Sequence, residues 1–363
     1  MKKAWLSCLL LTLIAALVIC VPAFAEKTVT FTFTGDCTIG GTELTREATD
    51  SFDTVVGLEG YDYPFRYFKD LFSQDDCTVI NLEGVLTDSR GQERTDKTFR
   101  FRGQTDFVKI LTGASIDAAT LANNHILDFG QQGLNSTKNV LTENGIGWAY
   151  ILDSYIYEKD GIRIALISLD EVAYNTMLSR IRKEMTRLKE EKEADAIIVC
   201  FHSGQEYRST HSEEQERRGA NLVRYGADLV IMNHAHVIQG IRQFNNRTIC
   251  YCLGNFVFGG NNKLKGKSSF SRTTTSRYSL VVQARLTFSD DNTYLGQQVS
   301  LFPAFTSADP EWNLYQPFPV SGDNAAAVID AVQYDTDFQL PEITDQDGWS
   351  VIELPFLSAE SGE

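Results

Sequence analysis

Two of the five histidines in this sequence, His234 and His236, stand one residue apart directly after an apolar run, and imidazoles at this spacing can bind a metal ion. Residues 228–232 read as a buried strand, so the pair follows the strand's end. In an extended segment alternate side chains point to one side, so both rings can converge while Ala235 turns away. The same short pattern also occurs as two surface imidazoles in a loop, so a metal site has to be supported by other segments of the chain.

Four other strand-like runs end in side chains that can bind a metal or carry a proton. Residues 28–33 lead to Asp36, residues 78–80 to Glu83, residues 117–121 to Asn124 and His125, and residues 196–201 to His202. The helical stretches between these runs predict largely parallel strands, and such sheets bind ligands beyond the carboxyl ends of their strands. Five strand ends of this kind predict one shared site.

Asp128 follows His125 by three residues, which is about one helical turn. This spacing predicts a His–Asp pair in which the carboxylate orients the ring and raises its basicity. The alternative is an imidazole at a helix start that bonds to Asp128 for structure alone.

Read in order, these motifs resemble the CapA/PgsA-type proteins of poly-gamma-glutamate capsule synthesis. The matching segments are Gly35-Asp36, Asn81-Leu82-Glu83-Gly84, Ala122-Asn123-Asn124-His125 with Asp128 and Gly130, His202-Ser203-Gly204 with Glu206 and Tyr207, His234-Ala235-His236-Val237 with Gln239, and Leu253-Gly254-Asn255-Phe256-Val257-Phe258. The likeness runs from about residue 28 to about residue 340. That family is itself similar to the calcineurin-like metallophosphoesterases, which implies an α/β fold, a four-layer α/β/β/α sandwich with two mixed sheets.

The resemblance also implies roles for individual residues. Asp36 and His236 would bind one metal, Glu83 would bridge, Asn124, His202 and His234 would bind a second metal, and His125 would be the substrate-facing acid. Position 38 is Thr where the superfamily pattern has His, so either one or two ions are expected. Oxygen and nitrogen ligands together suit Mn, Fe or Zn better than Ca or Mg.

Three further residues are candidates for substrate binding. Arg100 and Arg102 alternate along one segment and could form a forked contact with an anion. The alternative is that both lie on the solvated face of a strand. Asn255 follows Gly254 and is either a turn residue or an amide beside the site.

The N-terminus predicts export. Lys2 and Lys3 precede an apolar run at residues 4–21 and an A-x-A site at residues 23–25, which is the layout of a secretory signal peptide over residues 1–25. The apolar run is also just long enough for an uncleaved membrane anchor. In either case the protein is expected outside the cytoplasm, secreted or anchored at the cell surface.

The net charge limits which partners can bind, and the cysteine count limits how many disulfides can form. The net charge of −15 becomes −17 once Lys2 and Lys3 are removed, and such a surface repels nucleic acid. Of seven cysteines, Cys8 and Cys20 fall in the signal segment, which leaves five, so at most two disulfides could form.

One domain is expected over residues 28–340, with a motif core at 28–260, a hairpin and short helix within 278–335, and an acidic tail at 341–363. Helices are expected at 104–112, 131–144, 175–193, 212–225 and 325–332, hairpin strands of a second sheet at 278–287 and 293–301, a polar loop at 261–277, and a last strand at 349–352. His211 is expected to be an exposed loop residue.

Two classes of function follow. In the first, the protein is an exported metal-dependent hydrolase or transferase that acts on phosphoester or amide bonds of an anionic cell-envelope polymer or its precursor. In the second, it is a non-catalytic accessory subunit of a membrane-bound synthase complex that binds or guides the nascent polymer. Fold alone does not separate them.

Overall fold

Two large β-sheets form the centre of the computed structural model, which describes residues 26–264 and 275–359. One sheet has eleven strands and the other has six. A small third sheet consists of β2 (Gly41–Thr42), β5 (Phe101–Gly103) and β4 (Val85–Leu86).

The eleven-stranded sheet is mixed. Its parallel part consists of β1 (Lys27–Thr38), β3 (Cys77–Leu82), β6 (Ala118–Thr120) and β7 (Gly147–Ala149), and β14 (Asn255–Phe258) is parallel to the end of β1. On the other side of β1, the strands β15 (Tyr278–Phe288) and β16 (Tyr294–Phe305) are antiparallel.

The six-stranded sheet is mixed as well. Its parallel strands are β9 (Ile162–Asp170), β10 (Ala196–His202), β11 (Leu229–Asn233) and β13 (Arg247–Cys250). Antiparallel strands β8 (Tyr155–Lys159) and β12 (Ile241–Phe244) close its two edges.

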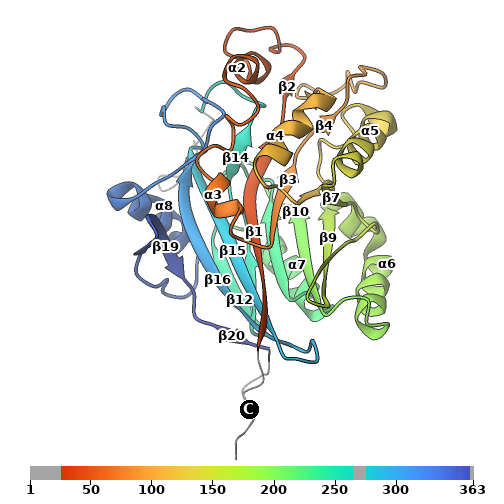
Figure 1. Ribbon diagram of the computed structural model, residues 1–363, viewed down its shortest axis with the longest axis vertical. Coiled ribbons are helices and arrows are strands. Elements are labelled where there is room, and N and C mark those ends of the chain that lie inside the picture. Colours follow the sequence, from red (N-terminus) through yellow and green to blue (C-terminus); the bar gives the residue numbers. More distant parts are fainter. Residues whose placement is uncertain (1–25, 265–274, 360–363) are drawn as a thin grey trace, which may run out of the picture.

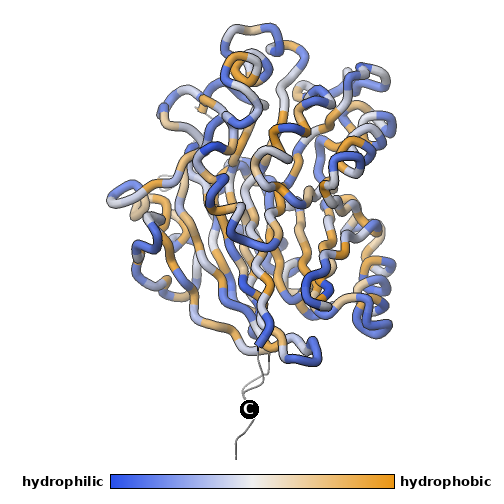
Figure 2. The backbone as a smooth tube through the Cα atoms, viewed as in Figure 1, coloured by the Kyte–Doolittle hydropathy of each residue, from blue (hydrophilic) through white to orange (hydrophobic). Residues whose placement is uncertain are grey.

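Helices cover the outer face of each sheet. The eleven-stranded sheet is covered by α2 (Phe52–Glu59), α3 (Lys69–Phe72), α4 (Val108–Gly113) and α5 (Gly130–Glu143), and the six-stranded sheet by α6 (Glu171–Glu190) and α7 (Glu213–Arg224). Between the sheets, Phe31 and Val79 of one belong to the same buried cluster as Ile164 and Ile198 of the other. In Figure 2, hydrophobic colour gathers along the strands and hydrophilic colour along the loops. The expected four-layer α/β/β/α sandwich with two mixed sheets is therefore confirmed.

The structure corrects the expectation for the hairpin β15–β16. It does not join a second sheet, because β15 pairs with β1 from Lys27 to Phe33 and so extends the sheet that β1 starts. Burial explains this choice, since Leu280, Val282 and Ala284 lie in the core between the two sheets.

The last strand expected at 349–352 is present, and further short strands accompany it in the described part of the acidic tail. Strands β18 (Thr344–Gln346), β19 (Trp349–Glu353) and β20 (Leu357–Ser358) pair with one another or with β16, as does β17 (Phe318–Pro319). Ile352 and Leu354 are buried in the core beside α8 (Gly322–Tyr334). Burial of these apolar side chains stabilises the strands, although the segment is rich in acidic residues.

Two smaller expectations also differ from the structure. His211 is partly buried, because its ring stacks on Tyr251 at 3.9 Å and its Nδ1 bonds to Asp335 at 2.9 Å. The five cysteines of the described residues are all buried free thiols, so no disulfide forms among them. The expected polar loop at 261–277 lies partly outside the described residues.

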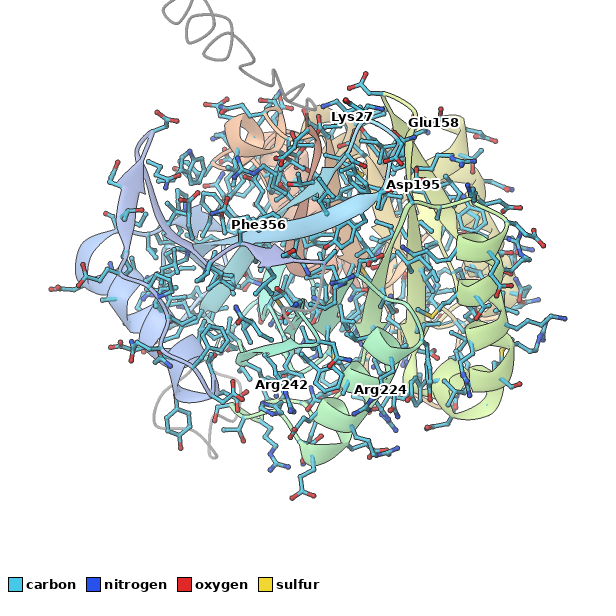
Figure 3. All side chains as sticks on the ribbon, turned by 90° about the horizontal axis from the view of Figure 1, so that it is seen from below. Lys27, Glu158, Asp195, Arg224, Arg242 and Phe356 are labelled. Atoms are coloured by element: carbon cyan, nitrogen blue, oxygen red, sulfur yellow. The ribbon has the colours of Figure 1, made fainter. Side chains whose placement is uncertain are left out.

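The parallel strands of both sheets run toward the same end of the molecule. In Figure 1, β1 rises from the bottom of the view toward β2 and α2 at the top. Lys27 and Asp195, which stand at the starts of β1 and β10, are labelled in the view from below (Figure 3). Among the described helices, none combines the length and the apolar character that a membrane span requires. The predicted signal segment at residues 1–25 lies outside the described residues.

Candidate metal centre

The carboxyl ends of strands from both sheets place polar side chains at one edge of the sandwich. Asp36 of β1 pairs in register with Asn81 of β3 and with Asn255 of β14. In the other sheet, His202 ends β10 opposite Asn233, the last residue of β11. Because the sheets pack face to face, the two sets of strand ends meet.

Two groups of three side chains there could each hold a metal ion. Asp36, Glu83 and His236 form one group, and Glu83, His202 and His234 form the other. Glu83 belongs to both groups, as a bridging ligand would. Its Oε1 lies 3.7 Å from His202 Nε2 and 3.9 Å from His236 Nε2. These separations are too long for hydrogen bonds and match two ligands that share one metal at about 2.0–2.2 Å from each.

The burial of Glu83 tests whether the residues fit a cation. Its side chain is fully buried, and neither carboxylate oxygen has a hydrogen-bond partner in the described structure. A buried carboxylate without a partner is costly, and native proteins pair such groups or use them to bind metals. The donor set of carboxylates and imidazoles therefore fits a divalent transition metal.

The pKa shifts of Glu83 and His236 also indicate that this buried site favours a positive charge. Burial raises the pKa of Glu83 well above its usual range, and the nearby Asp36 carboxylate adds to this. Burial acts to lower the pKa of His236, but the Glu83 and Asp36 carboxylates outweigh it and raise that pKa to about 10. Burial together with the neighbouring imidazoles lowers the pKa of His202 and of His234, which favours the neutral form of both rings.

The histidine pair reaches the site by a different backbone from the one expected. His234 and His236 do not continue an extended strand, because their φ angles are +112° and +56°. Positive φ is uncommon for residues with a side chain and is typical of turns, so the chain turns at both histidines. The turn buries Ala235 in a small apolar cluster with Val237 and Cys252, and both rings still face the centre.

Asn255 orients one of these rings. His236 Nδ1 lies 2.9 Å from Asn255 Oδ1 and donates to it, which leaves Nε2 facing Glu83. Asn255 is buried, and its side-chain oxygen contacts His236, which is a candidate metal ligand. Its predicted role in substrate binding stays a prediction.

Asn81 was not among the candidates from sequence, and it contacts both groups. Its Nδ2 donates to Asp36 Oδ1 at 2.7 Å and lies 3.2 Å from His202 Nδ1. On the far side of the His202 ring, Nε2 lies 2.8 Å from Asn124 Oδ1. A buried amide at the end of an apolar strand was the available signal for Asn81.

His125 and Asp128 form a buried pair beside the centre. His125 Nδ1 donates to Asp128 Oδ2 at 2.6 Å, and Nε2 lies 3.8 Å from Glu83 Oε1. Asp128 also accepts from the Phe101 backbone at 2.9 Å and pairs with Lys97 Nζ at 2.5 Å. Burial lowers the pKa of His125, and Asp128 opposes this in part. Lys97, from a loop without any motif, could not be identified from sequence.

The structure does not bring Arg100 and Arg102 into the centre. Arg102 is buried and pairs with Glu43 at 2.6 Å, and its NH1 donates to the Thr87 carbonyl at 2.8 Å. Arg100 pairs with Glu93 at 2.8 Å. Their predicted contact with an anion would require these ion pairs to open.

A model of the family described as "Bacterial capsule synthesis protein PGA_cap" matches residues 30–260. The chain belongs to the bacterial capsule synthesis protein PGA_cap family. This match covers the strands and loops that carry the candidate ligands, and it confirms the resemblance to CapA-type proteins.

Several named proteins are similar to this PGA_cap chain. The PGA biosynthesis protein CapA of Bacillus subtilis (strain 168) is 25% identical, with 66% of this chain and 65% of the relative covered. The capsule biosynthesis protein CapA of Bacillus anthracis is 26% identical, with 56% of each covered. A probable polyglutamine synthesis accessory protein of Mycobacterium tuberculosis (strain CDC 1551 / Oshkosh) is 42% identical, with 50% of this chain and 55% of the relative covered. The chain thus spans less than two thirds of the length of each.

Solved structures show weaker likeness. A hypothetical protein from Thermus thermophilus aligns with a TM-score of 0.45 at 13% identity, over 76% of this chain and 99% of that chain. TT1561 of the same organism aligns with a TM-score of 0.37 at 13% identity, over 63% and 90%. Neither alignment indicates a function.

Proposed function

We propose that this protein is an exported, metal-dependent hydrolase of the phosphoesterase type that acts in the synthesis of capsular poly-gamma-glutamate or a related cell-envelope polymer. The observation that carries the proposal is the buried Glu83 carboxylate, which has no hydrogen-bond partner in the described structure and stands between two groups of metal-ligand side chains. Relatives named for PGA and capsule biosynthesis support the polymer.

The chain's own residues would divide the work of holding a divalent metal such as Mn, Fe or Zn. Asp36, Glu83 and His236 would hold one ion, and Glu83, His202 and His234, with Asn124 beside His202, a second. Bound there, such ions polarise a phosphoryl or carbonyl oxygen and make hydroxide available near neutral pH.

His125 would move a proton at the leaving group. Its Nδ1 proton is held by Asp128, so Nε2 is the nitrogen that faces the centre. To act as an acid the ring must carry a second proton, on Nε2, and Asp128 favours this doubly protonated form. That proton can be given to the departing oxygen or nitrogen atom, which leaves the neutral ring with its proton on Nδ1. Lys97 and the Phe101 amide hold Asp128 in place and thereby keep the ring in this orientation.

The charge of the chain limits how an anionic polymer can bind. With a net charge of −15, the surface repels a polyanion at long range, and Arg100 and Arg102 are taken up in ion pairs. The polymer or its precursor would therefore be drawn to the bound metals. The same repulsion argues against nucleic acid as a partner, and a membrane-bound synthase complex is the proposed setting.

A second function has one specific observation in its favour. The Mycobacterium tuberculosis relative is named as an accessory protein of polyglutamine synthesis. On this alternative, the same centre binds or guides the nascent polymer without turnover.

Metal content and turnover, measured together, separate the two. The full chain is dialysed, its Mn, Fe and Zn are quantified, and phosphomonoesters, phosphodiesters and gamma-glutamyl amides are tested as substrates. A hydrolase binds metal and turns over at least one class, and His125→Ala abolishes the turnover. Bound metal without turnover of any class favours the accessory role. Absence of bound metal after loading contradicts both versions of the metal centre.

A further inference from the structure

Asn81 occupies a distinctive place among the candidate ligands. It lies near the end of β3, is 6% exposed, and pairs in register with Asp36 on one side and Thr120 on the other. Its amide nitrogen reaches Asp36 at 2.7 Å and His202 Nδ1 at 3.2 Å. Asp36 belongs to one metal group and His202 to the other, so one side chain links the two groups.

The neighbours determine which way the amide points. An Asp36 carboxylate can only accept hydrogen bonds, so the NH₂ group of Asn81 must face it. Asn81 Oδ1 points the other way, 3.4 Å from Asn123 Nδ2 and 3.5 Å from Thr120 Oγ1. The second hydrogen of the NH₂ group is then directed at His202 Nδ1, which accepts it.

This orientation selects one tautomer of His202. If Nδ1 accepts from Asn81, the neutral ring carries its proton on Nε2 and donates it to Asn124 Oδ1 at 2.8 Å. Nε2 is also the nitrogen that lies 3.7 Å from Glu83, where a metal would bind. In this state His202 cannot be a ligand through Nε2.

Metal binding by Nε2 therefore requires a rearrangement. The ring proton then has to be on Nδ1. There it points at the NH₂ group of Asn81, so two hydrogen-bond donors face each other. Rotation of the amide presents Oδ1 to Nδ1–H and removes the conflict, at the cost of only two long contacts to Asn123 and Thr120. The rotated Oδ1 then also faces Asp36, and two acceptors repel each other unless a cation neutralises the carboxylate.

We propose that Asn81 is a positioning residue that couples the two metal positions, so that a cation bound at Asp36 favours the amide orientation in which His202 binds a second cation. The inference rests on the proposed metal centre. Coupling of this kind is a ratio of affinities, and each ion must tighten the binding of the other equally.

The test is a calorimetric titration of the full chain with Zn²⁺ alone, and separately with Mn²⁺ alone. In wild type the two ions are expected to bind in two resolvable steps, and a change in the ratio of the two binding constants between wild type and variant reports the coupling. Asn81→Ala is expected to weaken the second step by about tenfold relative to the first, within the 10–100-fold range that ligand-orienting residues show. Asn144→Ala is the control, because it removes an exposed side-chain amide that bonds the Val140 carbonyl away from the centre, and it should leave the ratio unchanged.

A second variant and a second measurement guard against a folding defect. Asn81→Asp has the same shape, and its carboxyl group would share one proton with Asp36, 2.7 Å away. With that proton on Asp36, the oxygen that faces His202 can only accept, so it should hold His202 with the proton on Nδ1 even without metal. Nitrogen-15 spectra of the histidine side chains report this directly: the proton is expected on Nε2 in metal-free wild type and on Nδ1 in Asn81→Asp. Thermal unfolding of each metal-free variant shows whether it is folded.

The outcomes separate this inference from the proposed function. Two ions whose stepwise constants are the same in wild type and Asn81→Ala overturn the coupling alone, as does a proton on Nδ1 in metal-free wild type. Binding of a single ion also overturns the coupling and leaves the metal centre standing. A chain that binds neither Zn²⁺ nor Mn²⁺ overturns both.

Discussion

At the scale of single residues, the five histidines differ in the contacts of their rings, although all lie near carboxylates. His234 and His236 are held by a strained turn, His202 by amides on both ring nitrogens, and His125 by Asp128. His211 lies apart, stacked on Tyr251. Contacts of each ring, rather than the residue type, decide whether it can bind metal.

This division makes a prediction for two substitutions. His234→Ala should lose bound transition metal on dialysis, because it removes a direct ligand from a small set. His125→Ala should change metal affinity by at most about 10–100-fold and should lower any turnover by about 10²–10⁴-fold, because it removes a proton carrier. Elemental analysis after dialysis and a substrate assay measure the two effects.

His211→Ala is the control, since it removes an imidazole outside the centre and should keep both metal and activity. Wild-type metal stoichiometry in His234→Ala would show that this ring is not a ligand. Full activity in His125→Ala would remove the proton-transfer role and favour the accessory function.

Asp75 allows a prediction about pH and stability away from the centre. Burial raises the pKa of Asp75 to about 7 from its usual 3.8, although Thr32 and Thr78 hydroxyls lower it in part. The folded state thus holds this proton more tightly than the unfolded state. Its contribution to stability is fully present below a pH of about 4 and is lost as the pH rises through about 7.

Asp75→Asn imitates the protonated form and should remove this dependence. Between a pH of about 4 and a pH of about 8, the free energy of unfolding of wild type should fall relative to that of the variant. Urea denaturation at several pH values gives the difference, in which the other titrating groups cancel. A constant difference across this range would mean that Asp75 does not titrate in the folded protein as inferred.

At the scale of elements, the centre depends on how closely β1 and β14 approach each other. Asp36 N donates to the Gly254 carbonyl at 2.9 Å, and a Cβ on Gly35 would lie 2.2 Å from the same oxygen. The atoms in the way belong to the backbone, which cannot move aside as the end of a flexible side chain could. The missing side chain at Gly35 is what lets the two strands present Asp36 and Asn255 together.

Gly35→Ala is therefore expected to lower both the melting temperature and the metal affinity, because the strands must separate and Asp36 must move. Gly57→Ala is the matched control. Gly57 lies in α2 with open space around its Cα, so alanine should stabilise the helix by up to about 1 kcal/mol. Thermal unfolding and a Zn²⁺ titration follow both effects, and unchanged metal affinity in a folded Gly35→Ala protein would contradict the argument.

At the scale of the whole molecule, the metal centre and the start of the described chain lie at opposite ends of β1. Lys27 begins β1 at the bottom of Figure 1, and Asp36 lies nine residues further along the strand, which corresponds to about 30 Å. A protein held at its N-terminus would thus present the centre away from the point of attachment.

Export is the prediction that belongs to this scale. The two lysines, the apolar run at 4–21 and the A-x-A site should direct the chain out of the cytoplasm. Fusion of residues 1–30 to a reporter that is active only outside the cytoplasm should give activity, and a fusion that starts at residue 26 should not. Equal reporter activity from both fusions, or none from either, would contradict the predicted localisation.

The sequence by itself determined the local parts of this protein. Apolar runs predicted the strands that carry Asp36, His202 and Asn233 at or near their carboxyl ends. Periodic segments predicted helices that the structure has as α4, α5, α6 and α7. Periodicity and turn residues act over a few positions, so they can be read without knowing the fold. The order of the motifs was also sufficient to identify the family.

Only the tertiary structure decided what depends on partners distant in sequence. Asn81 meets His202 across 121 positions, and Arg102 is drawn to Glu43 across 59 positions rather than left free for an anion. A strand at 349–352 was predicted, but its pairing with β16 and the burial of Ile352 and Leu354 depend on the rest of the fold. Sheet pairing, burial and side-chain hydrogen bonds are set by the whole chain at once, so no local pattern contains them.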